Sequence, residues 1–191
     1  MAFERGQPLA HEVMTKEPAP EGKTNRAVNL SSVEGYDSLP SYLPNGKIAF
    51  TSKRDGDYDL YLMRAARQRP RNVPVKLTKN AVNDLGPGWS PNGTHFVFNS
   101  NRSGNSEVYR MKAAPQGRLN KPINLSRNPA DDTSPTWSPD GRKVAFNSDR
   151  PGSDDTTDLD IWRMRATDGA NPTNLTDNAV VDFDLEWQPV P

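Results

Sequence analysis

The sequence contains no cysteine, no long apolar run and no excess charge of either sign, and each absence excludes a class of protein. Without cysteine, the chain has neither a disulfide framework nor a thiolate metal site. Because no apolar run approaches the length of a membrane span, we expect no membrane insertion. Lys and Arg together number 24, as do Asp and Glu, so the charge balance gives no reason to expect nucleic acid as a partner.

Hydrophobic residues make up only 33% of the chain, a value that by itself favours disorder. The 18 prolines and 13 glycines argue against disorder, because they fall at recurring turn positions. The turn glycines Gly46, Gly93 and Gly141 are separated by 47 and 48 residues, which is about the length of a four-stranded propeller blade. The sequence therefore predicts a repetitive folded chain.

The clearest copy of the repeat occupies residues 134–150. Its first strand ends at Ser138, and the Pro-Asp-Gly of residues 139–141 has the composition of a tight hairpin turn. The Val-Ala-Phe of residues 144–146 is typical of a second strand, and the copy closes with Ser-x-Arg. Corresponding copies occupy residues 39–54 and 86–102.

This pattern resembles the TolB-like (WD-like) β-propeller repeat, whose hallmark is P-x-W-S-P-D-G-x-x-[IV]-A-F-x-S-x-R, followed by an aromatic strand and a final Leu-Thr or Leu-Ser. The resemblance covers nearly the whole chain. It implies an all-β fold of four-stranded antiparallel blades. For function, it implies a component that binds a partner, as TolB-like proteins do at the cell envelope.

The period divides a single domain, residues 1–191, into blades. Complete repeats occupy residues 37–78, 84–126 and 132–176. Residues 1–31 align with the second to fourth strands of a repeat, whereas residues 182–191 match a first strand, with Trp187 in the place of Trp137. We therefore predict a four-bladed propeller in which the C-terminal strand completes the N-terminal blade and closes the ring.

Two charged positions recur on one predicted face, where the loops between fourth and first strands meet the hairpins between second and third strands. The acidic position, five residues before the first-strand aromatic, holds Asp37, Asp84, Asp132 and Asp182. The basic position, four residues after the second-strand Phe, holds Arg54, Arg102 and Arg150. In one interpretation each Asp caps its loop or pairs with a neighbouring Arg. In the other, the four carboxylates ring the channel mouth and bind a hard cation such as Ca²⁺, while the arginines contact a partner.

The last repeat has a longer hairpin between its second and third strands. Phe146 and Ile161 are 15 residues apart, against 10 residues in the two preceding repeats. The extra residues belong to an acidic stretch at residues 151–158 that includes Asp154 and Asp155. We interpret this stretch as a tolerated surface insertion or as a finger that contacts a partner.

Motifs of catalysis are scarce. The two histidines, His11 and His95, share no repeat position, and the sequence contains no nucleophile elbow, metal-ligating His pair or phosphate-binding glycine loop. The first-strand aromatics, such as Trp137, are more typical of packing between blades than of a sugar platform.

The sequence therefore favours a non-catalytic, monomeric propeller that binds a protein or peptide through its loop face and channel mouth. One alternative is a small-ligand hydrolase, lactonase-like or a glycosidase, that uses the channel-mouth carboxylates with or without Ca²⁺. Another is a sugar-binding propeller. No secretory signal is visible in residues 1–6, which favours the cytoplasm, although the mature domain of a periplasmic or secreted protein would read the same way.

Overall fold

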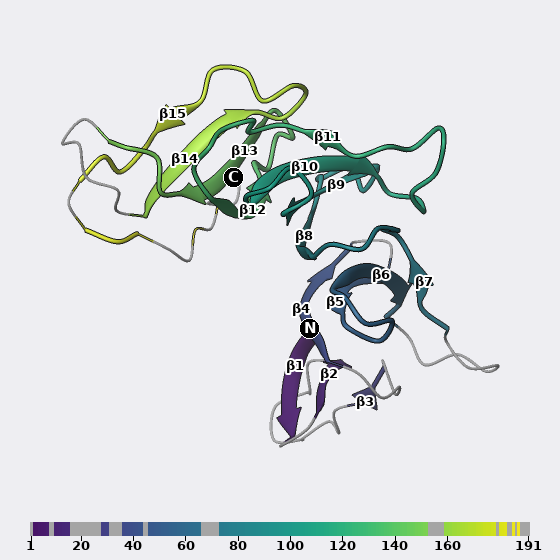
Figure 1. Ribbon diagram of the computed structural model, residues 1–191. Helices are drawn as coiled ribbons and strands as arrows, with labels where there is room; N and C mark the ends of the chain where they lie inside the picture. Colours follow the sequence, from purple (N-terminus) through teal and green to yellow (C-terminus); the bar gives the residue numbers. More distant parts are fainter. Residues whose placement is uncertain are drawn as a thin grey trace. The chain divides into compact units, whose positions relative to one another are not determined.

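A computed structural model of the chain (Figure 1) describes residues 2–7, 10–15, 28–30, 36–43, 46–65, 73–152, 159–178, 180–182, 185 and 187. Within these ranges every regular element is a β-strand. The same ranges contain no helix that is long and apolar enough to cross a membrane. The all-β class predicted from the sequence is confirmed.

Three four-stranded antiparallel sheets, each with its strands in sequence order, account for most of the described residues. One sheet comprises β4 (Asp37–Tyr42), β5 (Lys47–Ser52), β6 (Asp59–Arg64) and β7 (Val75–Lys76). The next comprises β8 (Asp84–Trp89), β9 (His95–Ser100), β10 (Glu107–Lys112) and β11 (Ile123–Asn124). The last comprises β12 (Asp132–Trp137), β13 (Lys143–Ser148), β14 (Asp160–Arg165) and β15 (Thr173–Asn174). The strands lie where the repeat predicts them.

A three-stranded sheet precedes these, formed by β1 (Ala2–Gln7), β2 (Ala10–Thr15) and β3 (Val28–Asn29). These strands occupy the places that the period gives to second, third and fourth strands. The first strand predicted for this sheet, residues 182–191, lies mostly outside the described residues. Its pairing therefore stays a prediction.

The Ser-Pro-Asp/Asn-Gly turns between first and second strands are held by the side chains that the motif specifies. Ser138 Oγ donates a hydrogen bond to Asp140 at 2.6 Å and accepts one from the Lys143 amide at 2.9 Å. Gly141 has a φ of 70°, in the left-handed region that favours glycine. The tight hairpin turn that the sequence predicted at residues 139–141 is therefore present in the structure.

The first strands carry an irregularity that the motif did not predict. The ladders between β4 and β5 and between β12 and β13 shift register in mid-strand. Leu39, Gly86 and Ser134, which share one repeat position before a proline, have φ values of 50°, 63° and 51°. A left-handed residue at this point bends each first strand, at a conformational cost for the leucine and the serine.

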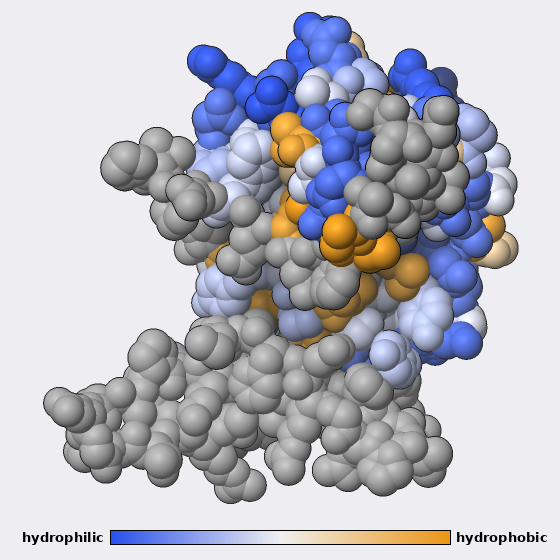
Figure 2. Space-filling model, turned by 90° about the vertical axis from the view of Figure 1, so that its left-hand side faces the viewer, coloured by the Kyte–Doolittle hydropathy of each residue, from blue (hydrophilic) through white to orange (hydrophobic). Residues whose placement is uncertain are grey.

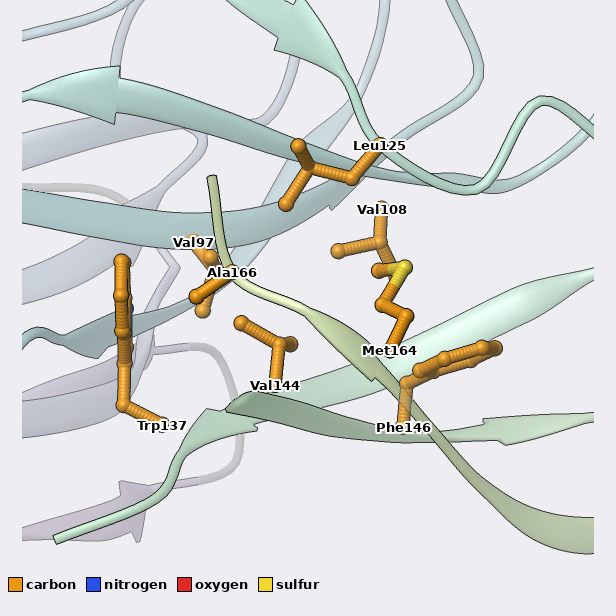
Figure 3. Packing of buried hydrophobic residues seen from close by; sticks show 8 residues of the cluster. All are labelled: Val97, Val108, Leu125, Trp137, Val144, Phe146, Met164 and Ala166. Atoms are coloured by element: carbon orange, nitrogen blue, oxygen red, sulfur yellow. The ribbon is translucent and has the colours of Figure 1, made fainter. Parts of the chain in front are cut away.

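The chain divides into two compact units, residues 1–87 and 88–191. In the second unit, apolar side chains of the two sheets form one buried cluster (Figure 3), made of Val97, Val108, Leu125, Trp137, Val144, Phe146, Met164 and Ala166. Trp137 lies at one end of this cluster, and Phe146 and Met164 lie at the other (Figure 3). The strands β12 and β9 pack together around it.

The first unit is built in the same way. Its buried cluster joins the N-terminal sheet to the sheet of β4 to β7 and comprises Val13, Leu30, Ile48, Phe50, Tyr61 and Met63. On the face drawn in Figure 2, hydrophilic residues predominate and hydrophobic residues form separate patches. Among the described residues, each of the two buried apolar clusters joins two sheets.

We predict that Gly169 is required for the packing of the two sheets of the second unit. Its φ is 77°, and an added Cβ would lie 1.8 Å from the carbonyl oxygen of Leu125. Gly46, with a φ of 76° and nothing within 4 Å of the added Cβ, is a matched control. In denaturant unfolding, Gly46→Ala should cost about 1–2 kcal/mol from backbone strain alone. Gly169→Ala should cost clearly more, on the order of 3 kcal/mol, and equal losses would contradict the packing.

Candidate functional site

The Ser-x-Arg at the end of each second strand folds back over the blade. In the repeat of residues 37–78, Arg54 Nε donates to Ser52 Oγ at 2.8 Å, and Arg54 Nη2 donates to both carboxylate oxygens of Asp37 at 3.1 Å. The guanidinium also lies 5.3 Å and 4.7 Å from the ring centroids of Phe50 and Tyr61. The arginine is therefore fixed by a hydroxyl, a carboxylate and two aromatic faces.

A similar arrangement, which together with that of Arg54 we call the arginine clasp, occurs in the last repeat, where Arg150 Nε has no hydrogen-bond partner among the described residues. Arg150 Nη2 donates to Asp132 Oδ2 at 2.7 Å, and its guanidinium lies 5.2 Å from the Phe146 ring and 5.3 Å from the Trp162 ring. In the repeat of residues 84–126, Arg102 Nε donates to the Oγ of Ser100 at 2.9 Å. Its guanidinium stacks over Phe98 and Tyr109 at 5.4 Å and 4.8 Å.

Burial makes the carboxylates of the clasp dependent on their arginines. Asp37 and Asp132 are both 0% exposed. Burial raises the pKa of Asp132 above its ordinary value, although the bond from Arg150 opposes the shift. For Asp37 and Asp132, the structure thus contains the pairing with arginine that one interpretation of the sequence predicted.

Asp84 and Asp182 accept hydrogen bonds from asparagines of their own loops. Asn80 Nδ2 donates to Asp84 at 2.6 Å, and Asn178 Nδ2 donates to Asp182 at 2.9 Å. The Oδ1 of each asparagine accepts the backbone N–H two residues on, so the loop closes on itself. Sequence reasoning missed these asparagines, although their recurrence four residues before the aspartate was a usable signal.

The aspartates also connect successive sheets through their backbone. The amide of Asp84 donates to the Tyr58 carbonyl at 2.7 Å, and that of Asp132 to the Ser106 carbonyl at 2.8 Å. The amide of Asp182 donates in the same way to the Leu159 carbonyl, at 2.7 Å. In each case the backbone amide of the aspartate donates to the backbone carbonyl of the residue just before the third strand of the preceding repeat.

A second recurring bond explains the final Leu-Thr or Leu-Ser of the repeat. Thr78 Oγ1 donates to Asp59 at 2.9 Å, Thr176 Oγ1 donates to Asp160 at 2.8 Å, and Ser126 Oγ donates to Glu107. Each hydroxyl also accepts the amide of the residue that follows the acid on the third strand. These residues hold the short fourth strand and belong to the construction of the blade.

The described ranges contain no group of three or more His, Cys, Asp or Glu side chains placed to hold a metal ion. Calcium binding by Asp37, Asp84, Asp132 and Asp182 stays a prediction. Asp154 and Asp155 lie outside the described residues. Partner contact by them, and by Arg54, Arg102 and Arg150, also stays a prediction.

A pocket of about 240 Å³ opens in the second unit at the opposite end of the strands, beside the hairpin turns of β9 and β13. Its walls include His95, Arg110, Trp137 and Asp140. Burial lowers the pKa of His95, and the nearby Arg110 and Lys112 lower it further. The sequence alone did not predict a site at His95. The other wall residues occupy different positions of the repeat, so the repeat pattern does not bring them together with His95.

The clasp predicts that Asp132→Asn destabilises the protein, because Arg150 is then left buried without its counter-ion. The loss should be on the order of 1–3 kcal/mol in denaturant unfolding, and Arg150→Gln added to Asp132→Asn should recover part of it. Calcium should leave the melting temperature of the wild type unchanged. A calcium-dependent rise that Asp132→Asn abolishes would support the metal site instead.

Comparisons with known proteins agree with this construction. Residues 20–123, more than half of the chain, match a family model described as the TolB beta propeller domain. No curated protein sequence is similar enough to count as a relative of the chain.

Several solved structures share the fold. TolB from Acinetobacter baumannii is 20% identical with a TM-score of 0.69, over 94% of this chain and 41% of that one. A putative TolB from Agrobacterium tumefaciens is 21% identical with a TM-score of 0.60, over 86% of this chain and 60% of that one. A puromycin-hydrolyzing peptidase of Mycobacterium tuberculosis is 13% identical with a TM-score of 0.63, over 87% of this chain and 25% of that one. The chain thus spans less than two thirds of the length of each of these three proteins. At these identities the similarity shows a shared fold only. By its family match, its repeated motif and its sheets, the chain belongs to the TolB beta-propeller domain family.

Proposed function

We propose that the chain is a non-catalytic, four-bladed propeller that binds a protein or peptide partner through its loop face. The observation that carries this proposal is the arginine clasp. The clasp uses the charges of Arg54, Asp37, Arg150 and Asp132 within the blade, where they fix the loops instead of serving as free acids or bases. Loops held on a rigid sheet form a surface suited to recognition.

The contacts of the C-terminal segment support a closed ring. Besides the bond from Asp182 to Leu159, Asn147 Nδ2 donates to the Asp182 carbonyl at 2.7 Å. Trp187 Nε1 lies 3.5 Å from the carbonyl oxygen of Thr136, which it approaches as a donor. Trp187 therefore lies against the last repeat, where the first strand of a following blade belongs. Blades at residues 37–78, 84–126 and 132–176, and a composite blade of 182–191 and 1–31, complete the proposed ring.

Closure predicts that removal of residues 182–191 exposes an apolar sheet face and an unpaired strand edge. The truncated chain should aggregate, or melt far below the full chain, in size-exclusion chromatography and thermal unfolding. Removal of residues 190–191 alone serves as the control and should have little effect. A monomeric truncated chain of unchanged stability would contradict closure.

Binding and catalysis are separated by two measurements on the full chain. The immobilised chain should retain a partner from the native host, and a panel of lactones, esters, glycosides and aminoacyl amides should show no turnover with or without calcium. A variant with a short glycine turn in place of residues 154–157 should keep its stability within about ±0.5 kcal/mol and retain less partner. Turnover that Asp132→Asn abolishes would favour the hydrolase alternative.

A further inference from the structure

Two adjoining hollows of the second unit share His95 and Arg110. The inner one, of about 240 Å³, is walled by Trp137 and by the hairpin turns of two repeats, where an added Cβ on Gly141 would lie 3.7 Å from Pro91. The outer one, of about 160 Å³, continues past Arg110 along β10 toward β11. Because they share walls, we treat them as one feature and call it the basic groove.

The inner part of the groove contains hydrogen-bond donors that lack acceptors. The Trp137 side chain is nine-tenths buried, and its Nε1 has no hydrogen-bond partner among the described residues. Arg110 Nε is likewise buried without a partner there. Indole and guanidinium groups only donate, and a buried donor left unpaired costs free energy. An oxygen acceptor that reached either nitrogen would supply the missing hydrogen-bond partner.

The charge around the groove has one predominant sign. Arg110, Lys112 and Lys121 line it. The one acidic side chain in its walls, Asp140, already accepts hydrogen bonds from Ser138 Oγ at 2.6 Å and the Arg142 amide at 2.9 Å. The groove therefore favours an anionic acceptor over a neutral one.

The outer part adds apolar surface on a fixed loop. Leu119 is 92% exposed and Ile123 is 42% exposed, and both line the outer hollow. Asn120 holds the loop, because its Nδ2 donates to the Ala114 carbonyl at 2.7 Å and its Oδ1 accepts the Lys112 amide at 3.2 Å. Leu119 and Ile123 therefore place an exposed apolar surface beside the cationic residues of the groove.

We infer that the basic groove binds an acidic peptide segment of a partner protein. An Asp or Glu carboxylate of the segment accepts hydrogen bonds from Arg110 and from Trp137 Nε1, and a neighbouring apolar side chain packs against Leu119 and Ile123. The inference rests on the proposed binding function and gives it a second surface. That surface lies at the end of the strands opposite the loop face, so the two surfaces can be tested separately.

The test uses the full chain labelled with ¹⁵N and two synthetic peptide pools. One pool fixes Glu between two leucines in otherwise varied octapeptides, and the matched pool carries Gln in its place. The Glu pool should shift the indole signal of Trp137, identified by its loss in Trp137→Phe, and the Arg110 Nε signal. The Gln pool should shift neither, because an uncharged amide gains less from these donors.

Arg110→Gln should weaken binding of the Glu pool about tenfold, as expected for one charge-assisted hydrogen bond. Arg163→Gln is the matched control, because Arg163 has the same repeat position on β14, is exposed and does not line the groove. It should leave binding unchanged. Because the shifts are measured first in the wild type, a variant that fails to fold does not decide the outcome.

Three results would overturn the inference: no shift of the Trp137 and Arg110 signals, equal shifts with both pools, or saturation of the same signals by inorganic phosphate at the same concentration as the Glu pool. Each of these leaves the proposed function standing, because the loss of partner capture in the variant at residues 154–157 tests it at the loop face. Turnover that depends on Asp132, with the groove still binding the Glu pool, would reject the proposed function alone.

Discussion

The constraint on which this protein depends is that a four-stranded sheet cannot bury its apolar face by itself. In the second unit, Val97 and Val108 of one sheet need Val144 and Phe146 of the next, and the cluster exists only between them. Close approach of the sheets then selects small residues. An added Cβ on Gly88 would lie 2.8 Å from the Pro135 carbonyl oxygen, so this position requires a glycine.

The polar ends of the strands follow from the same packing. Where the sheets come together, the aspartates that begin first strands are withdrawn from water and need compensation. Arg54 and Arg150 supply it from the end of the second strand of the same blade, and the adjacent aromatic faces keep each guanidinium in place. The clasp therefore has a structural origin, and its product is a set of loops held in a fixed geometry.

The arginine clasp and the basic groove lie at opposite ends of the strands, and the two ends differ in their polar groups. At the loop end, Asp37 and Asp132 pair with Arg54 and Arg150, while Asp132 Oδ1 and Arg150 Nε have no hydrogen-bond partner among the described residues. At the turn end, Arg110 and Trp137 retain donors without acceptors. The solved structures that share the fold include TolB and a peptidase of which this chain covers 25%, so the fold by itself does not assign a function.

The sequence by itself determined the strands, the turns and the composition of each blade, because those depend on neighbours within one repeat. Pro-Asp-Gly, Ser-x-Arg and the final Leu-Thr are local signals, and the structure places each where the period does. Contacts between repeats were decided only by the tertiary structure. Trp137, Arg110 and His95 come from different positions of the motif, and they line one pocket because the sheets of the second unit pack together. The repeat identifies residues at the same position in successive sheets. It does not identify residues at different positions that meet where two sheets pack together.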